Sequence, residues 1–371
     1  MKSMLFMVVF WIAIASSYAT SQDYALGSIT TIQGFAMASG GNSVSTAGDI
    51  NGDGVSDVII GNSLYNLNTG ITYVIFGSRD ASIANFDLAT FTTSATTGFR
   101  ILASTVDENS GSSVSCAGDV NGDGVDDVIM GSWAANVGVK TDGGISYVIF
   151  GRKVTSPTNA FTDIQLPITA LAASVGFRIL GALAHDYSGW SVSNAGDFNN
   201  DGIDDVIVGA ISADPPSLTA ASNAGIVYVI FGKNMTGSAL AFGDVGLLSM
   251  GSSSTIGFRI LGAGIADRLG NSVSAAGDVN GDGISDVIVG ANLADPPNLA
   301  ADSNAGISYV IFGRNIPLGT AWSEIQLTTS AMASNVGFRI LGAVANDQSG
   351  FAVNSAGNMS FLRINVPSFP F

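Results

Sequence analysis

A nine-residue acidic loop recurs four times in this sequence and carries most of its chemistry. Its copies span residues 49–57, 119–127, 197–205 and 278–286. In every copy an oxygen-bearing side chain stands at positions 1, 3, 5 and 9, and glycine stands at position 6. Alternate oxygens on a tight turn, together with the backbone carbonyl of position 7, form a set of hard ligands that suits Ca²⁺. The glycine permits the positive φ of a sharp turn. The pattern therefore predicts one calcium site in each loop.

Two other interpretations of this loop can be tested on the sequence. The EF-hand shares its first half, but an EF-hand has a bidentate glutamate at position 12 and a helix on each side. Position 12 is apolar in all four copies, and each loop runs directly into an Asp-Val-Ile segment typical of a strand. These apolar residues are Ile60, Met130, Val208 and Val289. Asn-Gly and Asp-Gly pairs alone often make hairpin turns, but a turn does not require three carboxylates within nine residues.

The acidic loop belongs to a longer repeat that fills most of the chain. A phrase beginning Gly-Phe-Arg-Ile-Leu starts at Gly98, Gly176, Gly257 and Gly337, roughly 80 residues apart, and a shorter copy starts at Gly34. Each complete unit closes with Tyr-Val-Ile-Phe-Gly, which gives four full units and part of a fifth. Short β-branched and aromatic runs between glycine-rich turns are typical of strands. Four strands per unit predict an all-β β-propeller with one blade per unit, and a solenoid of sheets would have shorter units.

Composition excludes several classes of function. The chain has 29 acidic and 13 basic residues, and its formal charge of −16 disfavours binding to nucleic acid or to anionic membranes. One histidine, His185, and one cysteine, Cys116, cannot build a histidine-rich zinc hydrolase or a disulfide scaffold. We find no nucleophile elbow, P-loop or dinucleotide fingerprint. We therefore predict that the chain is not an enzyme and has no catalytic residues.

The amino-terminal segment is typical of a secretory signal peptide. Lys2 precedes an apolar run over residues 4–15, and the small residues Ser17 and Ala19 follow with the spacing of a cleavage site. We expect residues 1–19 to be removed and the protein to be secreted or extracellular, with an uncleaved anchor as the alternative. Asn234 and Asn358 begin glycosylation sequons, which matter only if the source organism glycosylates secreted proteins.

The repeat unit resembles the FG-GAP repeat, the blade motif of the integrin α-subunit propeller. Phe-Gly closes the Tyr-Val-Ile-Phe-Gly strand, Val-Gly-Ala follows Asp-Val-Ile, and the acidic loop joins two adjacent strands over residues 34–358. The resemblance implies a propeller over residues 20–360 with Ca²⁺ held in these loops, usually for rigidity. The implied ligands, in which position 7 contributes its carbonyl, are Asp49, Asn51, Asp53, Val55 and Asp57; Asp119, Asn121, Asp123, Val125 and Asp127; Asp197, Asn199, Asp201, Ile203 and Asp205; and Asp278, Asn280, Asp282, Ile284 and Asp286.

The departures from the integrin pattern shape the expected function. An integrin propeller has seven blades, so four blades and part of a fifth indicate a truncated form, with residues 361–371 as a non-repeat tail. The resemblance implies a role in cell adhesion or ligand binding, with an extracellular protein or matrix ligand as partner and no membrane span in the mature chain. Two alternatives stay open. One is a structural or surface repeat protein without a specific ligand, and the other is the accessory propeller of a secreted enzyme such as a glycosylphosphatidylinositol phospholipase.

Two further features vary or recur with the repeat. The loops that differ most between units are Asn62–Thr69, Trp133–Asp142, Ala210–Asn223 and Ala291–Asn304. We expect these loops to form a recognition surface, with Trp133 and Tyr65 as aromatic anchors. One arginine recurs in each Gly-Phe-Arg phrase, at Arg100, Arg178, Arg259 and Arg339. We expect it to form salt bridges between blades with the acidic turn residues Asp107, Asp186, Asp267 and Asp347.

Overall fold

The computed structural model describes residues 41–79, 87–167, 169–235, 242–317 and 319–355, which build an all-β propeller-type fold. Each blade is an antiparallel sheet whose four main strands follow one another along the chain. Blade 1 contains β1 (Ser43–Gly48), β2 (Asp57–Asn62), β3 (Ile71–Ile75) and β4 (Gly98–Leu102). Blade 2 contains β5 (Ser113–Gly118), β6 (Asp127–Ser132), β7 (Ile145–Ile149) and β9 (Gly176–Leu180). Blade 3 contains β10 (Ser188–Gly196), β11 (Asp205–Ala210), β12 (Ile226–Ile230) and β15 (Gly257–Leu261), and blade 4 contains β16 (Leu269–Gly277), β17 (Asp286–Ala291), β18 (Ile307–Ile311) and β21 (Gly337–Leu341).

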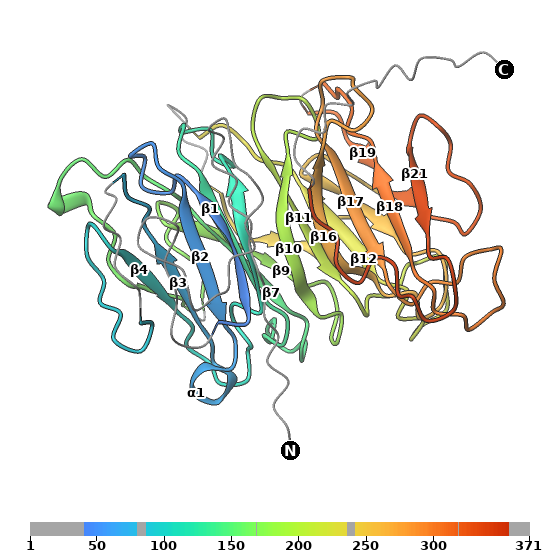
Figure 1. Ribbon diagram of the computed structural model, residues 1–371, viewed down its shortest axis with the longest axis horizontal. Helices are drawn as coiled ribbons and strands as arrows, with labels where there is room; N and C mark the ends of the chain where they lie inside the picture. Colours follow the sequence, from blue (N-terminus) through green and yellow to red (C-terminus); the bar gives the residue numbers. More distant parts are fainter. Residues whose placement is uncertain (1–40, 80–86, 168, 236–241, 318, 356–371) are drawn as a thin grey trace, which may run out of the picture.

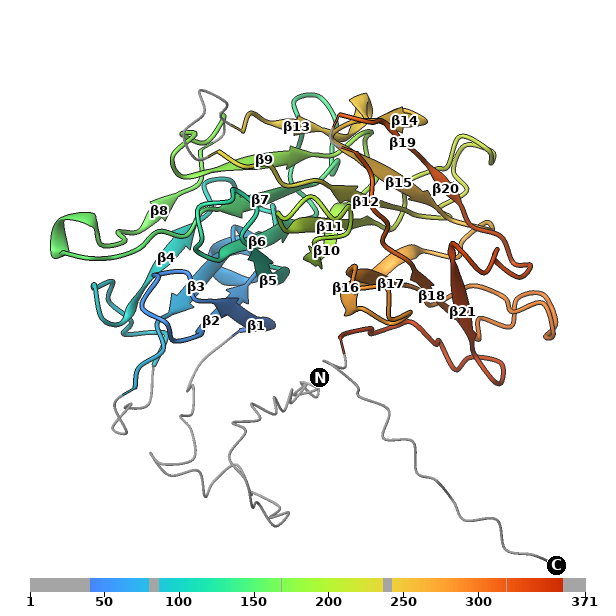
Figure 2. The same ribbon diagram turned by 90° about the horizontal axis from the view of Figure 1, so that it is seen from above.

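The four blades stand side by side in chain order (Figure 1) and form an open arc when seen from above (Figure 2). Seen from above, the first strand of each blade, β1, β5, β10 or β16, lies on the inner side of the arc and the fourth strand lies on the outer side (Figure 2). The inner backbones approach closely. A Cβ added at Gly131 of blade 2 would lie 2.0 Å from the Gly189 carbonyl oxygen of blade 3. Only glycine fits at this contact.

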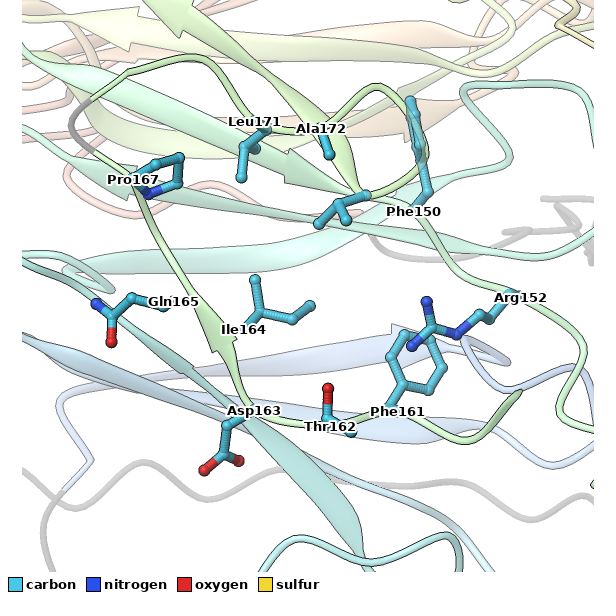
Figure 3. A pocket seen from close by; sticks show the side chains of 11 residues that line it. Phe150, Arg152, Phe161, Thr162, Asp163, Ile164, Gln165, Pro167, Leu171 and Ala172 are labelled. Atoms are coloured by element: carbon cyan, nitrogen blue, oxygen red, sulfur yellow. The ribbon is translucent and has the colours of Figure 1, made fainter. Parts of the chain in front are cut away.

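A short segment of each later blade crosses over to the blade before it. We call these segments straps and define them as residues 161–166, 242–247 and 322–327. Their strands β8 (Ile164–Gln165), β13 (Val245–Gly246) and β20 (Ile325–Gln326) add in parallel to β4, β9 and β15, the outer strands of the preceding blades. Figure 3 shows the first strap, with Phe161, Asp163 and Ile164 beside a pocket of about 280 Å³. Each blade is thus joined to its predecessor by backbone hydrogen bonds as well as by packing.

The remaining elements are short. They are α1 (Tyr65–Asn68), two 3₁₀ turns at Pro157–Asn159 and Leu247–Ser249, and the strand pair β14 (Ser253–Ser254) and β19 (Trp322–Ser323). In α1 the residues Asn66, Leu67 and Asn68 have positive φ, so this segment is a left-handed turn.

The straps correct one prediction from the sequence. Three of the recurring arginines join neighbouring blades, but their partners are strap carboxylates rather than Asp107, Asp186 or Asp267. Arg100 pairs with Asp163, Arg178 pairs with Asp244 at 2.6 Å, and Arg259 pairs with Glu324 at 2.5 Å. Arg339 donates to the Thr329 carbonyl instead. Asp186 and Asp347 serve their own turns, accepting the Leu183 amide at 2.8 Å and the Val344 amide at 2.9 Å. Asp107 accepts the Asn68 side-chain amide at 3.2 Å.

The hydrophobic core lies between the blades. Strands β7 and β12 are buried on both faces, because blades 2 and 3 each pack against a neighbour on either side. At each junction an aromatic strap residue lies on the phenylalanine of the preceding Gly-Phe-Arg strand, as Phe242 stacks on Phe177 with ring centroids 4.2 Å apart. A basic side chain covers the other face of the strap ring, and Lys233 lies 4.4 Å from the Phe242 centroid. The same three layers are Arg152, Phe161 and Phe99 at the first junction and Arg314, Trp322 and Phe258 at the third.

Blade 4 has one face that no described residue covers in this way. Phe338 and Ile340 of β21 are 40% and 45% exposed, whereas the equivalent Phe177 and Ile179 of β9 are 1% and 0% exposed. Within the described residues, β21 also has no strap along its edge. Strand β21 therefore keeps the apolar residues of the repeat, although the described residues include no following blade that would cover them.

Candidate metal-binding loops

The four acidic loops join the first two strands of each blade and share one hydrogen-bonded geometry. In the first loop, both the Asp49 carboxylate and the Asn51 amide oxygen accept the Asp53 N–H at 2.9 Å. The second Asp49 oxygen accepts the Gly54 N–H at 2.7 Å, and Asp53 accepts the Val55 N–H at 2.8 Å. Sharing one donor brings the oxygens of positions 1 and 3 close together. The loops at 119–127, 197–205 and 278–286 repeat these contacts within 0.3 Å.

The position-9 carboxylate anchors each loop to its blade. Asp57 is 1% exposed and accepts the Ile50 N–H at 3.1 Å and the Gly77 N–H at 2.8 Å. The pKa of Asp57 is raised to about 7. Burial is the main cause, the neighbouring carboxylates of Asp53 and Asp49 act in the same direction, and the two N–H donors act against it. Burial also raises the pKa of the equivalent carboxylates Asp127, Asp205 and Asp286.

The donor set of each loop fits Ca²⁺ in its chemistry. Every side chain at positions 1, 3, 5 and 9 offers oxygen, the donor that Ca²⁺ prefers. Among the described residues, no three carboxylate, imidazole or thiolate side chains already converge as a metal cluster. The carboxylates of positions 1 and 5 instead accept loop N–H groups. Asp49, Asn51, Asp53 and Asp57 would hold the ion with the Val55 carbonyl, and the equivalent residues would do so in the other loops.

The variable loops lie at the opposite ends of the blades from the acidic loops. Each connects the second and third strands of its blade, whereas each acidic loop connects the first and second. Tyr65, on α1, is 49% exposed. Trp133 is half-buried and lies in a cluster with Tyr187 and Trp190, at centroid distances of 5.3 and 5.4 Å. This cluster joins the variable loop of blade 2 to the connection that carries Tyr187 and to β10 of blade 3, which carries Trp190.

The other predicted positions are distributed as follows. His185 lies on an exposed turn with its Nδ1 3.4 Å from Asp142, away from the acidic loops. Asn234 is exposed, and Asn358 lies outside the described residues, as do the predicted signal peptide 1–19 and the tail 361–371. None of the helices in the described ranges is long and apolar enough to cross a membrane.

The sequence analysis missed the straps and the basic residues that cover them. A signal was present, because Arg152, Lys233 and Arg314 each follow a Phe-Gly pair directly. An aromatic residue then follows eight or nine positions later, with an acidic residue two positions beyond it. These positions hold the inter-blade contacts described above.

Comparison with known proteins agrees with this architecture. The chain carries FG-GAP repeats, and this family matches residues 40–75, 188–230 and 269–311. Blade 2 lies outside the matched ranges but has the same strand order and the same acidic loop. The chain is also similar to a phosphatidylinositol-glycan-specific phospholipase D from Dictyostelium discoideum, with 30% identity over 177 residues, which is 47% of this chain. The matched region spans 17% of that relative's length.

Proposed function

We propose that this protein is an extracellular calcium-binding propeller that acts as a non-catalytic recognition scaffold in adhesion or ligand binding. One observation carries the proposal: four blades present the same hydrogen-bonded loop of oxygen donors, each anchored by a buried position-9 carboxylate. Each loop carries three aspartates within nine residues, and carboxylates that converge on one site repel each other by roughly 1–4 kcal/mol per pair at contact distance. Ca²⁺ relieves this repulsion, and four ions would change the formal charge from −16 to −8 (4 × 2 = 8).

Calcium here has a structural role. The ion supplies a charge-neutralising centre that ties the start of the second strand to the loop before it. Because such an ion binds the folded state and not the unfolded chain, it stabilises the fold. Thermal unfolding in millimolar Ca²⁺ and in EDTA tests this: we expect a higher midpoint with Ca²⁺. An equal midpoint in both buffers contradicts calcium binding at these loops.

The variable loops are the proposed recognition surface, because they combine a rigid scaffold with sequence differences between units. The exposed Tyr65 and the Trp133 cluster give this rim aromatic side chains of the kind that dominate protein interfaces. Replacing the four loops with Gly-Ser should abolish Ca²⁺-dependent binding to an immobilised extracellular matrix preparation. Binding that survives the replacement contradicts this assignment of the rim.

A second candidate function rests on the Dictyostelium relative. The chain would then be the accessory propeller of a secreted phospholipase and would itself carry no catalysis. Its one histidine stands on an exposed turn beside Asp142 and belongs to no group of three potential metal ligands among the described residues. The purified chain should release no glycosylphosphatidylinositol-anchored protein from membranes. Release of the anchored protein contradicts the non-catalytic role in both candidates.

A further inference from the structure

Each of the first three acidic loops is held by the blade that follows it. The segment just after the third strand of blade 2 runs along the loop of blade 1, where Arg152 N–H donates to the Ile50 carbonyl at 3.0 Å and Val154 N–H donates to the Asn51 carbonyl at 2.8 Å. The same pair of bonds recurs twice, from Lys233 to Val120 and Met235 to Asn121, and from Arg314 to Phe198 and Ile316 to Asn199. We call this pair of bonds the loop clamp.

The clamp acts directly on the predicted ligands. Its two acceptors are the backbone carbonyls of loop positions 2 and 3, and position 3 is the asparagine whose side-chain oxygen faces the loop interior. Under the clamp, Asn51, Asn121 and Asn199 are 4%, 4% and 5% exposed. The backbone that carries the ligands of positions 1 and 3 is therefore fixed from outside the loop as well as from within.

The fourth loop has no clamp among the described residues. No described segment after β18 donates to the carbonyls of Val279 or Asn280. Val279 is 46% exposed, whereas the equivalent Ile50 is fully buried, and Asn280 is exposed. This loop keeps the four internal hydrogen bonds of the other three and adds one, from the Gly281 N–H to the Asp278 carboxylate at 2.7 Å. The missing clamp is therefore a difference in the surroundings of the loop.

We propose that the four loops form two classes of calcium site, with three tight sites under clamps and a weaker site at residues 278–286. This inference rests on the proposed calcium binding. A loop that moves freely must be ordered when the ion binds, and that ordering lowers the affinity. The clamp contributes two backbone hydrogen bonds of ordinary strength, so its absence should weaken binding on the order of ten-fold.

Calcium titration calorimetry of the full chain, stripped of metal beforehand, tests the proposal. We expect about three tight sites and one site roughly ten-fold weaker. The matched variants Asp123→Ala and Asp282→Ala remove position 5 of a clamped and of an unclamped loop. Asp282→Ala should delete the weak class, and Asp123→Ala should delete one tight site. Four equivalent sites, or loss of a tight site in Asp282→Ala, overturns the inference while leaving calcium binding intact, whereas no binding at all overturns the proposed function.

A second pair of variants changes the clamp and leaves every ligand in place. Val154→Pro removes the N–H that donates to Asn51, and Val154→Ala keeps it. We expect Val154→Pro to move one tight site into the weak class and Val154→Ala to leave all three tight sites. Equal titrations for the two variants contradict a role for the clamp, and the aspartate variants decide the proposal if Val154→Pro does not fold.

Discussion

Replacing Arg178 with methionine should destabilise the protein through one identifiable contact. The Arg178 side chain is 10% exposed and donates to both carboxylate oxygens of Asp244, at 3.1 and 2.6 Å. Methionine keeps much of the aliphatic volume but leaves the Asp244 carboxylate, 24% exposed, without this partner. Breaking a buried ion pair costs about 3–5 kcal/mol. The partial exposure of Asp244 lets water compensate, so we expect a loss of about 2–3 kcal/mol in the free energy of unfolding.

The chain offers a matched control at the same position of the repeat. Arg339 donates to the Thr329 carbonyl, and no carboxylate among the described residues pairs with it. We expect Arg339→Met to cost less than about 1 kcal/mol. Urea unfolding followed by tryptophan fluorescence measures both variants, and amide hydrogen exchange at β9 and β13 reports the local effect. Adding Asp244→Leu to Arg178→Met should recover part of the loss, because an apolar pair leaves no buried charge. Equal losses for Arg178→Met and Arg339→Met would refute the reasoning.

Three further predictions concern packing, pH and backbone approach. Phe177→Ala should cost about 3–5 kcal/mol because the ring is 1% exposed, whereas Phe338→Ala, at a 40% exposed ring, should cost about 1 kcal/mol or less by the same denaturation assay. Burial raises the pKa of Asp267 to about 6, so the folded state favours the protonated carboxyl, and the stability that this group contributes at low pH is lost as pH rises through 6. Asp267→Asn should therefore reduce the fall in the free energy of unfolding between pH 4.5 and 7.5 by about 2 kcal/mol. An unchanged pH profile of stability would contradict this. Gly131→Ala places a Cβ 2.0 Å from a backbone oxygen and should lower the unfolding midpoint, while Gly251→Ala, with nothing within 4 Å, should leave the midpoint nearly unchanged.

Much of the fold could be predicted because the same strand-forming segments recur in four units of the sequence. The Asp-Val-Ile and Tyr-Val-Ile phrases occupy β2 and β3 and their counterparts, and the acidic loops join the strands expected from the FG-GAP resemblance. The partner of Arg178 was missed, because Asp244 is 66 residues away and belongs to the next unit. The recurring spacing of basic, aromatic and acidic residues marks the strap positions but does not say which arginine they contact. A search within one unit finds the nearer Asp186 instead. Contacts between two units do not produce a short-range pattern in the sequence. The loop clamp also joins two units, and it uses backbone atoms alone, so no residue type marks it.

The strap arrangement also sets an order for assembly on the ribosome. The outer strand of a blade gains its neighbouring strap only after part of the next blade has been synthesised. Arg178, for example, pairs with Asp244, which is 66 residues later in the chain. At a synthesis rate of about 5–20 residues per second, this delay lasts about 3–13 s. During that interval the apolar face around Phe177 and Ile179 is open to solvent, as the face of blade 4 is in the described structure. Each nascent blade therefore has a period in which a chaperone or another chain can bind its exposed outer face. This period ends when the next unit has been synthesised and covers that face.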